Sequence, residues 1–121
     1  MEPPIFTVAA SDPEVIRLLG SSPVRLWPFG EAPQNAAYPY AVWQVINGTP
    51  ENYLAQRPDM DGLSLQVDVY GKSAGEVRAV VAALRRSLEL SAHITRIGRE
   101  SKDPPTNTYR SGFDLHWLHS R

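Results

Sequence analysis

Between residues 63 and 70 the chain alternates apolar and polar side chains without a break. Successive side chains of a β-strand point to opposite faces of a sheet, so this segment has one apolar face and one polar face. The pattern is typical of an antiparallel sheet that packs on a core with one side and meets water with the other. The apolar face carries Leu63, Leu65, Val67 and Val69.

The next segment changes from the strand period to helical spacing. Ser73 and Glu76 have the spacing of a capping box, which marks the start of a helix. Apolar residues then recur on one helical face, while arginines fall on or near the opposite side. The apolar positions are Val77, Val80, Val81, Leu84 and Leu88. We predict that this long helix lies on the apolar face of strand 63–70.

Shorter patterns complete the predicted fold. Further strands are expected at residues 24–27, 39–46, 93–99 and 109–118, with a turn containing two prolines at residues 102–107. Two short helices come first, one opened by Pro3 and Pro4 and one by a capping box of Ser11 and Glu14. We predict a single α+β domain over residues 1–121. It has two layers: an antiparallel sheet of about four to five strands, and one long helix on one face, with short N-terminal helices.

Residues 47–62 do not fit a simple hairpin connection. Connections longer than about 12–15 residues without structure are uncommon and are usually functional or disordered. Tyr53, Leu54 and Met60 argue against disorder, because apolar side chains gain by burial. The segment either folds back over an edge of its own sheet or protrudes as a loop or hairpin that docks on a neighbouring subunit. We favour the protruding segment.

Trp43 is the second feature that suggests contact between subunits. It lies on the face of its strand opposite Val42, in a sheet whose strand 63–70 has a polar outer face. A tryptophan on a sheet face without its own helix needs cover from elsewhere. A second copy of the chain provides that cover in one arrangement, and the two N-terminal helices provide it equally well in another.

The composition excludes several classes of function. The chain has 12 basic and 13 acidic residues and a formal net charge of −1, so it lacks the basic excess of proteins that bind nucleic acid through phosphates. It contains no cysteine, which excludes disulfides, thiolate metal sites and thiol nucleophiles. No stretch approaches the ~20 apolar residues of a membrane span, and the N-terminus has no signal-peptide pattern, so we expect no membrane partner.

The residues that could carry chemistry do not form a recognisable site. His116 and His119 would fall on opposite faces of a strand, and His93 is expected at the surface. Alternation separates Ser111 from Asp114 and His116, and no nucleophile elbow, phosphate loop or complete calcium loop is present. We therefore expect no catalytic residue, no metal site and no cofactor.

A set of short blocks resembles one known family, in order and spacing across nearly the whole chain. The family is the tail completion proteins of long-tailed bacteriophages, also called tail terminators or tail-to-head joining proteins. The blocks are Pro28-Phe29-Gly30-Glu31-Ala32-Pro33, Tyr38-Pro39-Tyr40-Ala41-Val42-Trp43-Gln44, Pro50-Glu51-Asn52-Tyr53-Leu54, Arg57-Pro58-Asp59-Met60-Asp61, Gln66-Val67-Asp68-Val69-Tyr70, and Tyr109-Arg110 with Phe113-Asp114. Pro105 and Gly112 are looser matches.

The resemblance implies a structural protein and not an enzyme. Its partners would be further copies of the chain in a homohexameric ring, the major tail tube protein and the head–tail connector, while DNA passes through the ring without specific binding. The protein would be made in the cytoplasm of the host bacterium and end in the virion, in the tail at the head–tail junction. The residues expected at subunit or partner interfaces are Trp43, Glu51, Tyr53, Leu54, Arg57, Asp59 and Met60.

The alternative from another class is a small bacterial α+β module that binds a ligand or RNA. Such a module needs a basic or aromatic platform on the open face of its sheet. The outward residues Ser64, Gln66, Asp68 and Asp114 do not make one. An enzyme ranks third, because no convergent set of reactive groups is found.

Overall fold

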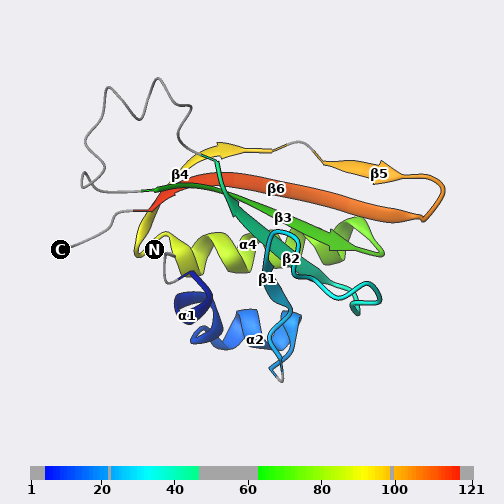
Figure 1. Cartoon of the computed structure of the whole chain (residues 1–121), viewed down its shortest axis with the longest axis horizontal. Coiled ribbons are helices and arrows are strands. Elements are labelled where there is room, and N and C mark those ends of the chain that lie inside the picture. The colour runs from blue at the N-terminus through cyan, green and yellow to red at the C-terminus, as the bar shows by residue number, and fades with distance from the viewer. Residues whose placement is uncertain (1–4, 22, 47–62, 99, 118–121) are drawn as a thin grey trace.

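The computed structural model describes residues 5–21, 23–46, 63–98 and 100–117. The fold is α+β, as the sequence predicted, and combines helices with a mixed sheet (Figure 1). The helices are α1 (Ile5–Ala10), α2 (Pro13–Leu19) and α4 (Ala74–Leu88). The strands are β1 (Leu26–Pro28), β2 (Tyr40–Val45), β3 (Leu63–Gly71), β4 (Ala92–Ile97), β5 (Ser101–Asp103) and β6 (Thr108–Trp117). The segment predicted to protrude, residues 47–62, lies outside the described residues.

The sheet has the strand order β1-β2-β3-β6-β4, and β5 pairs with the part of β6 that β4 leaves free. All neighbours are antiparallel except β1 and β2, which run parallel. The prediction of a fully antiparallel sheet was therefore wrong at this edge. Residues 29–39 carry the chain back to the starting end of β1, and a connection of that length allows a parallel neighbour where a tight hairpin does not.

Strand β5 is a second departure from the prediction. Residues 102–107 were expected to form a turn, but Ser101–Asp103 pairs with Thr108–Arg110, and only the four residues between them turn. Pro104 and Pro105 lie in that turn, where their missing N–H groups cost no ladder hydrogen bond. Three residues are too few for an alternation pattern to reveal a strand.

Helix α4 begins as the sequence indicates. Ser73 is the N-cap, and its hydroxyl accepts a hydrogen bond from the Glu76 N–H at 3.1 Å. The Glu76 carboxylate in turn accepts from the Lys72 N–H at 2.8 Å. The apolar side of the helix packs on β3 and β6, and α1 and α2 pack against α4 in turn (Figure 1).

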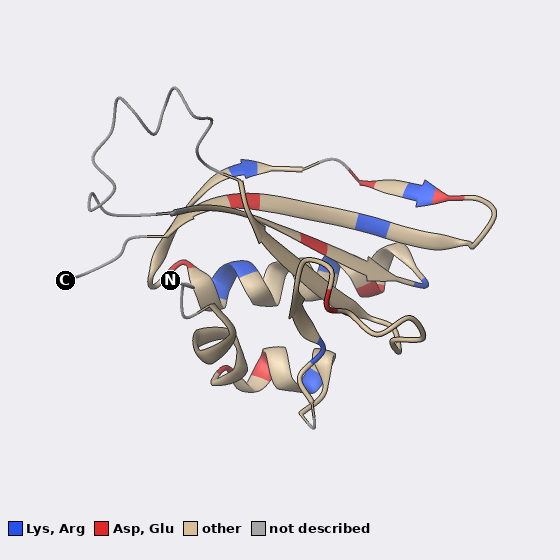
Figure 2. Ribbon diagram, in the orientation of Figure 1, with Lys and Arg blue, Asp and Glu red and all other residues tan. Residues whose placement is uncertain are grey.

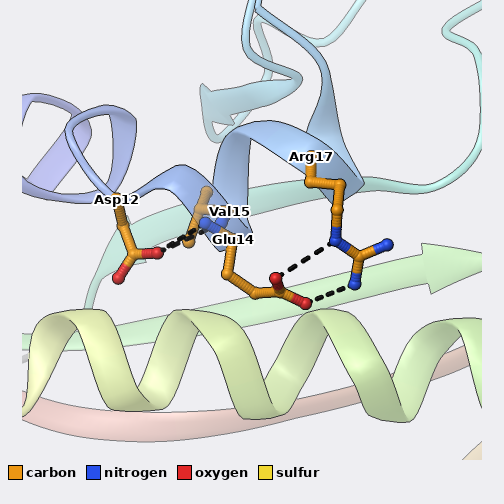
Figure 3. Close-up of polar contacts among 4 residues, drawn as sticks. All are labelled: Asp12, Glu14, Val15 and Arg17. Carbon is orange, nitrogen blue, oxygen red and sulfur yellow. Dashed lines mark hydrogen bonds and ion pairs between the residues drawn. The ribbon is translucent and has the colours of Figure 1, made fainter.

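Helix α2 begins differently from the prediction (Figure 3). Its N-cap is Asp12 and not Ser11, and the Asp12 carboxylate accepts hydrogen bonds from the N–H groups of Glu14 and Val15 at 2.8 and 3.3 Å. Pro13 then occupies the first helical position, where proline is favoured. Glu14, expected in the capping box, instead forms an ion pair with Arg17 three residues later in the helix. The hydrogen bond from Arg17 lowers the pKa of the Glu14 carboxyl.

The core lies between the helices and one face of the sheet. Its central row crosses three strands, because Trp43 pairs with Val67 and Val67 pairs with Phe113. These side chains are 5%, 0% and 1% exposed. Burying a large apolar side chain contributes about 1.5–3 kcal/mol, so this row is a main source of stability. The opposite face of the sheet is covered by no helix among the described residues (Figure 1).

Candidate assembly interface

Trp43, the one described residue of the expected interface set, lies inside the molecule. It belongs to the same buried cluster as Ile5 and Ala9 of α1 and Val15 and Leu19 of α2. Of the two arrangements considered for Trp43, the structure therefore supports cover by the chain's own N-terminal helices, and its placement at a subunit interface is corrected. The physical reason is the parity of β2, which puts Trp43 on the helix side of the sheet beside Val67.

The other six residues of the expected set follow β2 in the connection to β3. They lie outside the described residues. They are Glu51, Tyr53, Leu54, Arg57, Asp59 and Met60.

The helix-free face of the sheet carries a cluster of four aromatic side chains, here called the aromatic patch: Trp27, Tyr38, Tyr40 and Tyr70. The Tyr40 and Tyr70 rings stack with centroids 5.1 Å apart, across neighbouring strands. Tyr38 lies 5.5 Å from Tyr40 in a tilted arrangement, and Trp27 meets Tyr40 edge-on at 6.0 Å. Aromatic residues with a polar edge are enriched in the energetically dominant parts of protein interfaces.

Cations lie at two sides of the aromatic patch. The Lys72 Nζ atom is 4.9 Å from the centre of the Tyr38 ring, and the Arg110 guanidinium is 5.9 Å from the centre of the Tyr70 ring. Burial raises the pKa of the Tyr40 and Tyr70 hydroxyls, which therefore remain protonated near neutral pH. The patch thus presents neutral rings and hydroxyl groups beside two positive charges.

Next to the patch the same face is hollowed around Gly112. The hollow, of about 290 Å³, is bordered by Asp68, Asp114, Arg96 and Arg110 among others. Arg110 lies 3.5 Å from Asp68, and Arg96 lies 3.4 Å from Asp114. A Cβ atom at Gly112 would stand 2.3 Å from the Val67 carbonyl oxygen, so no other residue fits at this point of the sheet without a shift of the backbone.

Acidic and basic residues are interspersed over the sheet and the helices (Figure 2). On the open face the carboxylates of Asp68 and Asp114 each have an arginine partner, so the charges of this face largely compensate each other. Such a surface offers no continuous basic track for a nucleic-acid backbone.

The described residues that were considered for chemistry do not converge on one site. His93 and His116 are cross-strand neighbours, but among the described residues no group of three or more potential ligands could hold a metal ion. Ser111 is buried and pairs with Val69, while Asp114 and His116 are only partly buried and pair with Gln66 and Ser64. His119 lies outside the described residues. No described helix is long and apolar enough to cross a membrane.

The sequence prediction missed the aromatic patch, although part of its signal was available. Tyr40 and Tyr70 are at outward positions of their strands, and the pairing of β2 with β3 brings them together. Trp27 joins the aromatic patch only because β1 pairs in parallel with β2. Tyr38 lies before the start of β2, where strand alternation does not predict its direction. An outward tyrosine on each of two strands that become neighbours would have indicated the stacked pair, but not the other two rings.

The chain matches a known protein family. The family model described as "Tail completion protein gp17" matches residues 3–120, nearly the whole chain. No match to the chain was found among curated proteins.

Proposed function

We propose a specific role for this chain, which belongs to the tail completion protein gp17 family and so to the structural components of phage tails. It forms a homohexameric ring that caps the tail tube and joins it to the head connector. The observation that carries this proposal is the family match over residues 3–120, because it covers the whole of the described fold.

The ring acts by surface complementarity. A head-to-tail contact between identical subunits uses two different surfaces and generates a closed ring when its rotation closes. One side of the ring then matches the last ring of tube subunits, and the other side matches the connector. Because that second side does not match tube subunits, polymerisation of the tube stops.

The charge distribution supports a channel that DNA crosses without being held. Binding through phosphates requires an excess of basic side chains, and each phosphate contact strengthens the hold on the duplex. The chain has a formal net charge of −1, and the arginines Arg96 and Arg110 of the open face are paired with aspartates. A ring of such subunits lets DNA slide.

The oligomeric state tests the proposal directly. We expect the purified chain to form rings of six subunits in negative-stain images and by mass photometry, alone or after addition of tail tube protein. A chain that stays monomeric at high concentration, with and without the tube protein and the connector, contradicts the proposal.

The connection between β2 and β3 is proposed to be one contact segment of the ring. Replacing Tyr53 and Leu54 together with aspartate is expected to weaken the ring at least tenfold and to leave a folded monomer, because the charges oppose burial between subunits. Ala79→Asp with Ala82→Asp is the matched control, since both alanines are exposed on α4. A double Tyr53/Leu54 variant whose rings are as stable as the control's counts against this assignment.

One observation favours the RNA-binding alternative. The aromatic patch, with Lys72 and Arg110 beside it, has the residue types on which single-stranded bases stack. Its two central rings already stack on each other, which reduces the free ring surface. Fluorescence anisotropy with single-stranded RNA decides the matter: this alternative requires binding that weakens in Tyr40→Ala, whereas the ring proposal expects no binding by either protein.

A further inference from the structure

The two edges of the sheet both expose apolar side chains. Strands β1 and β4 are the outermost strands of the order β1-β2-β3-β6-β4. Directly after β1, Phe29 is 68% exposed, and on β4 Ile97 is 55% exposed. These are among the most exposed large apolar residues that the structure describes, and they lie at opposite ends of a sheet roughly 20 Å wide.

Beside β4 the surface forms an open groove, here called the β4 groove. It has a volume of about 490 Å³ and lies between β4 and the C-terminal half of α4, with Arg85 and Glu89 on the helix side. Ile94 and Ile97 pair with Leu115 and Phe113 and therefore lie on the helix-covered face of the sheet. Helix α4 packs on β3 and β6, so it leaves the β4 margin of this face accessible.

Phe29 is held in position by the backbone around it. Its N–H donates to the Trp43 carbonyl at 2.8 Å, and the Glu31 N–H donates to the Pro28 carbonyl at 3.0 Å. Gly30 has a φ of +85°, a conformation that glycine adopts without strain and that completes the turn. The phenyl ring therefore projects from a turn anchored to the sheet, and little order would be lost on binding.

The two exposed sites lie at nearly the same level along the strands. One continuous row of paired residues crosses it: Pro28, Trp43, Val67, Phe113 and Ile97. Phe29 directly follows the first of these, and Ile97 is the last. A contact between the two edges at the same level adds no translation along the strands, and such a contact closes into a ring when the strands run along the ring axis.

The charges near the two sites are compatible. The turn of Phe29 carries one charged residue, Glu31, which is exposed. Around the β4 groove, Arg85 pairs with Glu89 at 3.6 Å and Arg96 pairs with Asp114 at 3.4 Å. The carboxylate of a neighbouring turn would therefore meet a rim of compensated charges and no unpaired acid.

We propose that the ring contact seats Phe29 of one subunit in the β4 groove of the next, between Ile97 and the aliphatic part of Arg85. The occupant of the groove is thus a second copy of this chain. The inference rests on the proposed function, since it names the two surfaces of the ring contact. It is independent of the segment between β2 and β3.

Cysteine cross-linking tests this contact, and the natural chain contains no cysteine that would interfere. In the double variant Phe29→Cys with Ile97→Cys, oxidation or a short bismaleimide is expected to join neighbouring subunits covalently. Denaturing gels should then show a ladder that stops at the ring size. The single variants Phe29→Cys and Ile97→Cys should give no ladder, because each leaves one side of the contact without a thiol.

The outcomes separate this inference from the proposed function. Rings of the double variant that do not cross-link overturn the placement of Phe29 and leave the ring itself intact. A single variant that forms covalent dimers as efficiently as the double variant forms its ladder also overturns the placement, because it indicates a symmetric contact. Absence of any ring in the unmodified chain overturns both proposals.

A complementation experiment adds a readout that does not depend on thiols. Phe29→Asp and Ile97→Asp should each lose the ring, and an equimolar mixture should form one-to-one dimers through the single intact contact that remains. Leu90→Asp is the control, because Leu90 is 89% exposed and does not line the groove. Rings of Phe29→Asp and Ile97→Asp as stable as those of the control overturn the proposal.

Discussion

The two faces of the same sheet differ in how their side chains are satisfied. On the helix side, Val67 and Phe113 are 0% and 1% exposed and belong to the apolar core cluster. On the open side, their chain neighbours Asp68 and Asp114 are partly buried and pair laterally with arginines. One face therefore stabilises the fold by burying apolar side chains. On the other face, charged side chains pair with each other and need no helix to cover them.

This difference suggests that the two faces have different roles. On the helix face, the chain's own helices cover the central strands, and the margin along β4 is left accessible to a partner. The open face and the sheet edges keep aromatic rings, charges and exposed apolar groups accessible. Recognition of neighbours therefore belongs to the open face and the edges.

The largest expected effect of a substitution is on the helix face. Phe113→Ala should lower the free energy of unfolding by about 3–5 kcal/mol, because it leaves a cavity in the central row of the core. Urea unfolding followed by circular dichroism measures the loss. The control on the open face of the same strand is Asp114→Ala, which removes an ion pair with the exposed Arg96 and should cost clearly less. Equal losses in the two variants would contradict the division between the faces.

Gly112 is a position on the open face where an added side chain is poorly tolerated. Gly112→Ala should destabilise the protein by about 1–3 kcal/mol, because the added Cβ meets a neighbouring backbone carbonyl. Gly75→Ala is the matched control in α4, where a Cβ meets no atom, and it should stabilise by about 0.4–1 kcal/mol. Thermal unfolding of both variants reports the opposite signs, and a neutral Gly112→Ala would show that the sheet yields at this point.

The aromatic patch should contribute a smaller, pairwise stabilisation. A double-mutant cycle of Tyr40→Ala and Tyr70→Ala is expected to give a coupling free energy of about 0.5–1.5 kcal/mol, the usual value for a stacked pair. The measurement is urea unfolding of the two single variants, the double variant and the natural chain. Additive losses would indicate that the rings do not interact and that the open face contributes nothing at this end.

The smallest expected effect depends on pH. Burial raises the pKa of Tyr40 and Tyr70 above the ordinary value of 10.0, so the folded chain holds these protons more tightly than the unfolded chain. Their contribution is complete below that pH and is lost as the pH rises through the raised pKa values. Unfolding free energies at pH 8 and about pH 11 should therefore fall less in Tyr40→Phe/Tyr70→Phe than in the natural chain. An equal fall in both proteins would contradict the shift.

Much of the fold could be predicted from the sequence because local patterns determine it. The alternation at residues 63–70 and the capping pair Ser73 and Glu76 predicted β3 and the start of α4 almost to the residue. The prediction of the N-cap of α2 was wrong because Ser11 and Asp12 are adjacent and both can cap a helix. Asp12 is the N-cap because it is followed directly by Pro13, which suits the first helical position.

The candidate interface was harder to predict than the fold. The position of Trp43 depended on which face of β2 the helices cover, and that is a property of the assembled sheet. The aromatic patch likewise required the pairing of β2 with both β1 and β3. The interface role of the residues between β2 and β3 remains a prediction.

The sequence by itself determined most of the segments that become helices and strands, with β5 as the exception, the absence of thiol chemistry and the family to which the chain belongs, because these follow from spacing and residue type along the chain. Only the tertiary structure decided the parallel edge of the sheet, the burial of Trp43 and the row of paired residues that runs from Pro28, next to Phe29, to Ile97. The physical reason is that strand neighbours and register arise from long-range pairing, which places residues far apart in sequence on one line across the sheet.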